Sequence, residues 1–293
     1  MKTYPYYKLN AFTIGNSEGN PAAFLDLGTD PLSEDAMLAI AKEHSGFVSE
    51  VVYVNRDDTG SILLTYYSSE CEVAFCGHGT IATMYEVIRR DDGLRNSPVI
   101  EIGTNRMGRL NIYNHINEED CIYISAPDPL MIGCSLSRQS IAAALGIKDG
   151  AISDSLPLDI IDAGLRTLIV PIKNLADEIS MYPHEEGLKQ YCLKNSVDIV
   201  LVYSMETAGP GYFAHTRVFA PKFGYLEDPA TGSGNSAFGC YLIKNRKWNG
   251  HSIKIEQGGN RIFNEVRLRT KDGKVLFGGK ASLRIEGTYY TGE

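Results

Sequence analysis

The chain has 293 residues, of which 43% are apolar and 22% are charged, as is usual for a globular protein with a sizeable core. This length favours two domains. The chain has 28 Lys and Arg residues and 36 Asp and Glu residues, and it contains no run of five or more basic residues. Binding to nucleic acid is therefore not expected.

The sequence contains no stretch of about 18 apolar residues, and its start has no apolar leader pattern, so we expect neither a membrane span nor export. The six cysteines form no C-x-x-C pair, and we therefore expect no metal site. Thiols in a chain without an export signal indicate a reduced protein of the cytoplasm. Four of them are predicted to be small core residues: Cys121, Cys134, Cys192 and Cys240.

Strand-like and helix-like segments alternate along the chain, which predicts an α/β protein. In chain order they are a capped helix over 33–44, a strand over 62–68, an apolar helix over 80–90, a strand over 121–125, a capped helix over 137–146, strands over 168–172 and 198–203, an apolar helix over 235–247 and a pair of strands over 278–290. The two apolar helices have hydrophobic residues on most sides, so both are expected to be central and buried.

The two apolar helices also indicate an internal duplication. Each follows a strand and a glycine-rich turn, and His78 and Ser233, at the two helix starts, are 155 positions apart (233 − 78), about half the chain. The proline-rich stretch SAPDPLMIG at 125–133 is the expected boundary. We therefore predict a first domain over 1–125 and a second over 126–278.

The turn EDPATGSGNSAFG at 227–239 contains a G-x-G-x-x-A run. A dinucleotide fingerprint would follow a buried strand early in a βαβ unit, with an acidic residue about 20 positions later, and this run meets neither condition. We expect instead that the amides of Gly232, Ser233 and Gly234 bind a carboxylate at the helix start. The alternative is that these glycines serve only close packing.

The turn FCGHGT at 75–80 resembles the turn at 227–239, because Gly77, His78 and Gly79 stand at the start of the other apolar helix. Two such helix ends facing one another would hold a small anion from both sides. Cys76 adds a thiol, which ionises more easily at a helix N-terminus and then acts as a base or nucleophile. Racemisation with two opposed thiols is not supported, because the stretch EDPATGSG contains no second cysteine.

Glu50, His78 and Asp228 are the candidate proton-transfer residues. Glu50 precedes the apolar run VVYV, where a carboxylate is costly to bury unless it is paired or functional; the alternative is a surface acid at a strand edge. Asp228 is either catalytic or a residue of the turn before Pro229. The remaining histidines are predicted to be surface or capping residues: His44, His115, His184, His215 and His251.

These residues belong to motifs that resemble those of the phenazine biosynthesis PhzF-like isomerases, relatives of diaminopimelate epimerase and proline racemase. The matching stretches, in one order over nearly the whole chain, are AFT and GNPAAF (11–24), SEVVYV (49–54), CGHGT (76–80), DAGLRTLIVPI (162–172), RVFAPKFGYLEDPATGSG (217–234) and QG (257–258). The chain departs from the family at Val51 and Val52, where Thr-Ala is usual, so the phenazine precursor is not inferred as substrate.

The resemblance implies two similar α/β domains, each a barrel-like sheet wrapped around a central helix, with residues 279–293 crossing back to the first domain. It implies an active site in the cleft between the domains, with Glu50 as general acid/base, His78 and Asp228 in support, and Asn20 near the substrate. It also implies that Gly77 and Ser233 hold the substrate carboxylate. The expected reaction is proton transfer on a small carboxylate without a cofactor, and the resemblance is compatible with a homodimer.

Two other functions stay open beside this isomerase. An amino-acid epimerase or racemase would use Cys76 as its base. A protein on the same fold that only binds a small ligand, or a partner, would need no base at Glu50.

Overall fold

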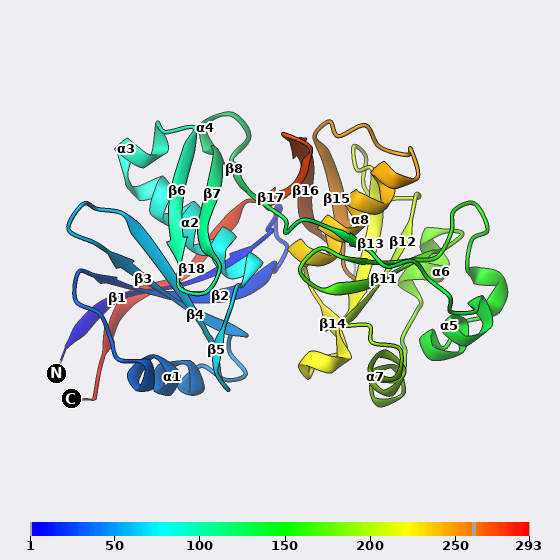
Figure 1. Ribbon diagram of the computed structural model, residues 1–293, viewed down its shortest axis with the longest axis horizontal. Helices are drawn as coiled ribbons and strands as arrows, with labels where there is room; N and C mark the ends of the chain where they lie inside the picture. The colour runs from blue at the N-terminus through cyan, green and yellow to red at the C-terminus, as the bar shows by residue number, and fades with distance from the viewer. Residues whose placement is uncertain (1, 260–261, 293) are drawn as a thin grey trace. The chain divides into compact units, whose positions relative to one another are not determined.

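The computed structural model describes residues 2–259 and 262–292 (Figure 1). The chain forms two compact units. The first unit contains the chain up to Ser125 and from Gly278 onward, and the second unit is Ala126–Phe277. Each unit has its own series of paired strands and its own buried helix.

The first unit places a curved sheet around one helix. Its elements are β1 (Thr3–Ala11), β2 (Asn20–Gly28), α1 (Glu34–Glu43), β3 (Glu50–Arg56), β4 (Ile62–Ser68), β5 (Glu72–Val73), α2 (Gly77–Arg90), α3 (Asp92–Arg95), β6 (Val99–Thr104), β7 (Gly108–His115), α4 (Ile116–Glu119), β8 (Cys121–Ser125) and β18 (Ala281–Tyr290). Neighbouring strands follow the order β18-β1-β2-β3-β4-β6-β7-β8. Helix α2 packs against β2 and β3 in the middle of this order and also against β18 and β8 at its two ends, so the sheet wraps around the helix.

The second unit repeats this plan. Its elements are β9 (Leu130–Met131), α5 (Arg138–Leu145), η1 (Asp149–Ala151), β10 (Asp159–Asp162), β11 (Arg166–Pro171), α6 (Leu175–Ile179), α7 (Glu185–Lys194), β12 (Ile199–Ser204), β13 (Ala214–Phe219), η2 (Pro221–Phe223), β14 (Glu227–Asp228), α8 (Gly232–Lys244), β15 (Ile253–Gln257), β16 (Asn264–Lys271) and β17 (Lys274–Gly279), within which the chain passes to the first unit. Helix α8 packs against β10, β11, β12 and β16.

The strand pairings confirm the internal duplication. Along β1-β2-β3-β4-β6-β7 the successive pairs are antiparallel, parallel, antiparallel, parallel and antiparallel. The same alternation runs along β10-β11-β12-β13-β15-β16. In each unit a two-residue strand, β5 or β14, pairs with the preceding strand just before the central helix.

The capped helices α1 and α5 begin at the predicted caps, whereas the central helices α2 and α8 begin earlier than predicted. The side chains of Ser33 and Ser137 cap α1 and α5, and Gly146 ends α5 in the left-handed conformation. Helices α2 and α8 each begin three residues before the predicted start, at the glycine-rich turns themselves. The strand pair predicted over 278–290 is wrong in detail, because β17 begins at Lys274 and β18 runs unbroken from Ala281.

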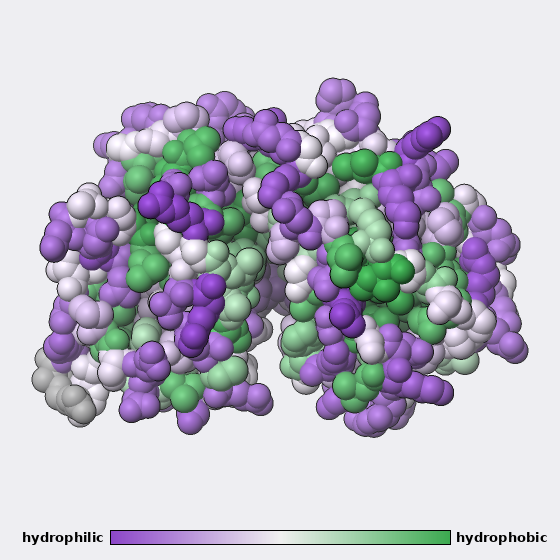
Figure 2. Space-filling model, in the orientation of Figure 1, coloured by the Kyte–Doolittle hydropathy of each residue, from purple (hydrophilic) through white to green (hydrophobic). Residues whose placement is uncertain are grey.

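Both central helices are buried on nearly all sides, as predicted. In α2 every residue from Gly79 to Ile88 is buried, and in α8 so is every residue from Gly234 to Leu242. On the face drawn in Figure 2, hydrophobic residues reach the surface of each unit in small groups among hydrophilic ones. No helix within the described part of the chain has the length and apolar character needed to cross a membrane.

Candidate active site

Glu50, Cys76 and His78 lie together in the first unit. Glu50 begins β3, opposite Ser68 of β4, and the chain returns through β4 and β5 to Cys76, the residue that caps α2. His78 Nε2 is 3.3 Å from Glu50 Oε2, and Cys76 Sγ is 3.5 Å from the same oxygen. The sulfur is also 3.6 Å from His78 Nδ1 and 3.8 Å from its Nε2. The strand pairing thus brings together three reactive groups that are up to 28 positions apart.

The cluster is partly shielded from solvent. The side chains of His78 and Glu50 are 15% and 22% exposed, and Cys76 is buried. Glu50 is therefore neither a surface acid in bulk water nor a fully buried charge. A carboxylate in such a position can exchange protons with a ligand and still remain hydrated in part.

The start of α2 orients the thiol. Cys76 Sγ accepts a hydrogen bond from the Gly79 amide at 3.3 Å, and the Cys76 carbonyl accepts from the amide and the hydroxyl of Thr80. A Cβ atom at Gly79 would lie 2.9 Å from that sulfur and 3.0 Å from Val52 Cγ2, so the close approach requires glycine. The Gly79 amide is thus used by the protein itself, whereas Gly77 and His78 carry the first amides of the helix, which have no acceptor within it.

Asn20 lies in the same unit, at the start of β2. It is buried and pairs with Ala11 of β1. Strand β2 runs parallel to β3 with Ala23 beside Val51. By this register, Asn20 lies on β2 two residues before the position that is adjacent to Glu50.

Asp228 lies at the corresponding helix start in the second unit. It is buried on β14, and the hydroxyl of Thr231, the cap residue of α8, donates to its Oδ2. Gln257 connects this turn to β15, because its side-chain amide donates to the Asp228 carbonyl and accepts from the Thr231 amide. The sequence motif included Gln257 without a role, and the structure identifies it as the residue that holds the turn.

The glycines of this second turn differ in what they contact. Gly232, Ser233 and Gly234 form the first turn of α8, whereas the sequence predicts them just before the helix. A Cβ atom on Gly232 would lie 2.2 Å from the ring of Phe277, whereas one on Gly234 would meet side chains no nearer than 3.3 Å. Close packing therefore accounts for Gly232, as the alternative interpretation held. Ser233 is half-buried beside it.

The prediction for His215 is wrong. The side chain is fully buried on β13, with Nδ1 3.1 Å from Glu178 Oε1, and the Glu178 side chain is also fully buried. Burial lowers the pKa of His215 to about 4, with a further contribution from Arg217, and burial raises the pKa of Glu178 well above its ordinary value. Strand β13 lies between β12 and β15, which explains why a polar residue in a mixed sequence context is enclosed.

Two other sequence predictions need comment. Cys134 is only half-buried, because it precedes α5 and packs at the edge of the core, whereas Cys121, Cys192 and Cys240 are buried as predicted. His44 occupies the C-cap position of α1, in agreement with the capping role predicted for it, although its side chain is buried and its ring contacts the Ile40 carbonyl and the Tyr6 hydroxyl.

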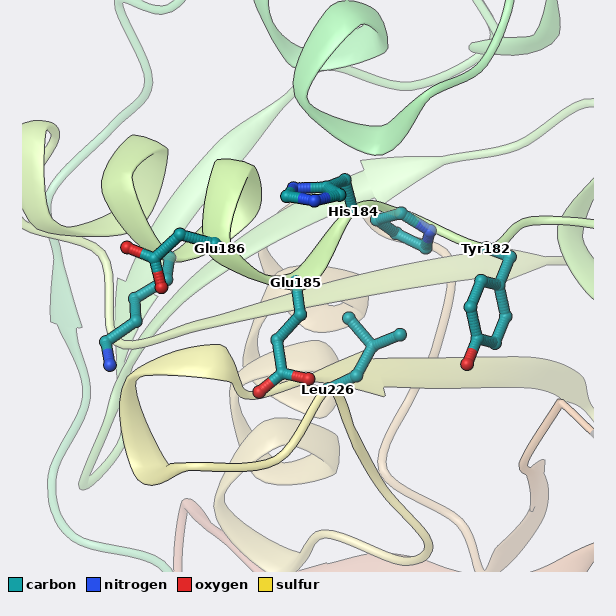
Figure 3. Close-up of a pocket in the computed structure, with 7 residues that line it drawn as sticks. Tyr182, His184, Glu185, Glu186 and Leu226 are labelled. Atoms are coloured by element: carbon teal, nitrogen blue, oxygen red, sulfur yellow. The ribbon is translucent and has the colours of Figure 1, made fainter.

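A surface cavity of about 560 Å³ lies at the start of α7, and none of its lining residues is a predicted site residue (Figure 3). Its lining includes Tyr182, His184, Glu185, Glu186 and Leu226. His184 Nδ1 accepts from the Gly187 amide and so caps α7, which confirms the structural role predicted for this histidine. The cavity is therefore built around a helix start that the protein already caps.

Comparison with known proteins identifies the family. Residues 9–287 match the family model PhzC-PhzF, described as phenazine biosynthesis-like protein. The chain belongs to the PhzC-PhzF family. A relative from Bacillus subtilis (strain 168), named Uncharacterized isomerase YfhB, is 30% identical over 297 residues that cover 98% of this chain and 96% of that protein.

Solved structures agree with this assignment. The crystal structure of the Bacillus anthracis phenazine biosynthesis protein of the PhzF family has a TM-score of 0.86 at 26% identity, covering 99% of this chain and 100% of that one. A hydroxyproline epimerase from Agrobacterium vitis has a TM-score of 0.60 at 12% identity, covering 99% and 91% of the two chains, which shows a shared fold. The PhzC-PhzF chain described here therefore has the predicted diaminopimelate epimerase-like α/β fold.

Proposed function

We propose that this protein is an isomerase that moves a proton within a small carboxylate substrate without a cofactor. The observation that carries the proposal is the partly shielded Glu50 carboxylate, 3.3 Å from His78 at the start of α2. Glu50 removes a proton from a carbon next to a carboxylate or double bond, and Glu50 or His78 returns one at another carbon. The relatives named as isomerases support this reaction class.

The start of α2 binds the substrate carboxylate. The amides of Gly77 and His78 precede the first residue with a helical acceptor, and the helix dipole adds a partial positive charge there. These donors stabilise the negative charge that develops when Glu50 takes the proton. Asn20 contributes a further polar contact from β2.

Asp228 is the second proton-transfer residue of the proposal, and Ser233 and Gly234 provide further amides. The hydrogen bond from Thr231 to Asp228 orients the carboxylate, and Gln257 holds the turn that carries it. The motif EDPATGSG, which this chain shares with the PhzF-like isomerases, supports these roles.

An epimerase or racemase that uses Cys76 is the second candidate. It is favoured by the contact of the Cys76 thiol with the Glu50 carboxylate, since a thiol beside a base is the usual arrangement of an activated nucleophile. Against it, the residue at the N-cap position of α8 is Thr231, where a two-thiol mechanism would need a second cysteine. The isomerase is therefore preferred.

The two candidates are separated by following deuterium incorporation into a panel of small carboxylates in heavy water. We expect exchange by the native protein and a fall of about 10²–10⁴ in rate for Glu50→Gln. Glu70→Gln, a change of an exposed acid in the same unit, is the matched control and should leave the rate unchanged.

Exchange that is lost in Cys76→Ser but retained in Glu50→Gln would support the thiol mechanism instead. A carboxylate that binds without any exchange, with the same affinity in Glu50→Gln, would replace the isomerase with a binding protein.

A further inference from the structure

The hydroxyl of Thr231 is not used in the way that its position predicts. Thr231 stands at the N-cap of α8, where a threonine side chain ordinarily accepts a hydrogen bond from an amide of the first turn. Among the described residues, no such amide donates to it, whereas Cys76, at the same position of α2, accepts from the Gly79 amide. The Thr231 hydroxyl donates instead to Asp228 Oδ2. A helix start that gives up its cap in order to bind a carboxylate indicates that this carboxylate is functional.

The side-chain amide of Gln257 can take only one orientation beside this hydroxyl. The Thr231 backbone amide and the Asn235 side-chain amide both donate to Gln257 Oε1, at 2.9 and 2.6 Å. The nitrogen Nε2 of Gln257 in turn donates to the Asp228 carbonyl at 2.9 Å and to Thr231 Oγ1 at 3.1 Å. Exchanging the oxygen and the nitrogen would bring donors against donors and leave the Asp228 carbonyl facing an oxygen, so the reversed amide is excluded.

The orientation of Gln257 decides where the hydrogen of the Thr231 hydroxyl points. A hydroxyl group has one hydrogen to donate. Because Thr231 Oγ1 accepts from Gln257 Nε2, its own hydrogen is directed to Asp228 Oδ2. That carboxylate oxygen is therefore an acceptor and carries no proton. A hydrogen bond donated to the charged form of a carboxyl group favours the charged form, so this arrangement favours an ionised Asp228.

The charged groups around this turn are compatible with a carboxylate at Asp228. Glu227, which precedes it on β14, is paired with Arg217 of β13 at 2.8 Å. The Glu256 carboxylate of β15 accepts hydrogen bonds from two backbone amides. The first turn of α8 contains no acidic residue, and the partial positive charge at the start of this helix stabilises a carboxylate just before it. The buried Asp228 side chain is therefore stabilised as an anion by donors that belong to its own turn.

We propose that Thr231, oriented by Gln257, is a positioning residue that holds Asp228 as a carboxylate with Oδ2 as an acceptor. Asp228 then has no proton to give when the substrate binds, and it acts in the reaction as a proton acceptor. The proton that returns to the substrate comes from Glu50 or His78. The catalytic part of this inference rests on the proposed function, whereas the ionised Asp228 rests on the contacts within the second unit alone.

The ionisation of Asp228 is tested on the full chain by a carbon-13 NMR titration of the aspartate carboxyl groups, in which the Asp228 signal is the one missing from Asp228→Asn. Thr231→Val keeps the branched side chain and removes the hydroxyl. A hydrogen bond to a charged group corresponds to about 10- to 100-fold in an equilibrium constant, so the midpoint of the Asp228 titration should rise by about 1–2 pH units in this variant. Thr231→Ser retains the hydroxyl and should restore most of the native midpoint.

Thr167→Val is the matched control, because Thr167 is a fully buried threonine of β11 whose hydroxyl donates to the Leu165 carbonyl rather than to a carboxylate. It should leave the Asp228 midpoint unchanged. Equal midpoints in Thr231→Val and the native protein overturn the proposal, and so does a shift in Thr231→Ser as large as that in Thr231→Val. The melting temperature of each variant verifies that it is folded.

The catalytic part is measured separately, as the pH dependence of deuterium exchange into carboxylates. Between the native and the shifted midpoint, Thr231→Val should lower kcat by up to about 10- to 100-fold, with KM changed less than about twofold. The loss should shrink as the pH rises above the shifted midpoint, which a merely structural defect would not cause.

A native kcat throughout this pH range, in a variant whose Asp228 midpoint has shifted, overturns the catalytic role of Thr231. A native protein that exchanges no carboxylate, but whose Asp228 midpoint rises in Thr231→Val as expected, contradicts only the proposed function and leaves the ionised Asp228 in place.

Discussion

Replacing Gly232 with alanine tests why the start of α8 is glycine-rich. The added Cβ would lie 2.2, 2.5 and 2.8 Å from three atoms of the Phe277 ring, and this ring is only 1% exposed. Carbon atoms in van der Waals contact are about 3.5–4.0 Å apart, so the ring or the helix must move by more than about 1 Å.

The expected loss of unfolding free energy follows from two opposing effects. Overpacking a well-filled core costs about 1–3 kcal/mol, and a shift of this size in a buried ring belongs at the upper end of that range. Alanine is favoured over glycine by up to about 1 kcal/mol inside a helix, but Gly232 is the first residue of α8, where the gain is smaller. We therefore expect Gly232→Ala to destabilise the second unit by about 2–3 kcal/mol.

Urea unfolding followed by tryptophan fluorescence measures this loss. The chain has one tryptophan, Trp248, which is buried in the second unit and would lie 3.2 Å from a Cβ atom on Gly239 of α8. Gly234→Ala is the matched control, since its Cβ would meet side-chain atoms no nearer than 3.3 Å and should cost less than about 1 kcal/mol. Equal midpoints for Gly232→Ala and the native protein would refute the packing explanation.

Three further predictions concern α2, the buried thiols and the second turn. Glu86→Gln should lower the unfolding free energy in urea by about 2 kcal/mol, because the nearly inaccessible Glu86 carboxylate accepts charge-assisted hydrogen bonds from Arg89 and Arg90. An unchanged urea midpoint would contradict this. Burial raises the pKa of Cys240 from 9.0 to about 11, so the contribution of the neutral thiol to stability is complete below pH 9 and is lost as the pH rises to 11. Between these pH values the native protein should lose up to about 2–3 kcal/mol more unfolding free energy than Cys240→Ala does. Identical profiles of unfolding free energy against pH would disprove this. Asp228→Asn should slow deuterium exchange into carboxylates about 100-fold or more, and a native rate would remove Asp228 from the mechanism.

The sequence alone was sufficient wherever a signal lies within a few neighbouring residues. Ser33 and Ser137 precede amphipathic stretches, and both cap helices in the structure. The apolar stretches after the two glycine-rich turns were recognisable as central helices, because a helix that is hydrophobic all round can only be stable when it is enclosed. The order of several motifs was enough to indicate the family and hence the fold.

Burial of single polar residues was not predictable in the same way. His215 stands in the mixed sequence FAHTRVF and looked like a surface residue. Its enclosure depends on pairing of β13 with β12 on one side and β15 on the other, and these strands come from separate parts of the chain. The residues around His215 do not determine whether their strand will lie in the middle of a sheet or at its edge.

The sequence determined the residue types and the helix starts, and these pointed to Glu50, Cys76 and His78 separately. Only the tertiary structure decided that one carboxylate oxygen lies 3.3 Å from an imidazole and 3.5 Å from a thiol. The same is true of Gly232, whose lack of a side chain is explained by a phenylalanine ring 45 positions later. The physical reason is that such distances are set by strand register and by packing between segments remote in the chain, and neither is encoded in the spacing of the residues themselves.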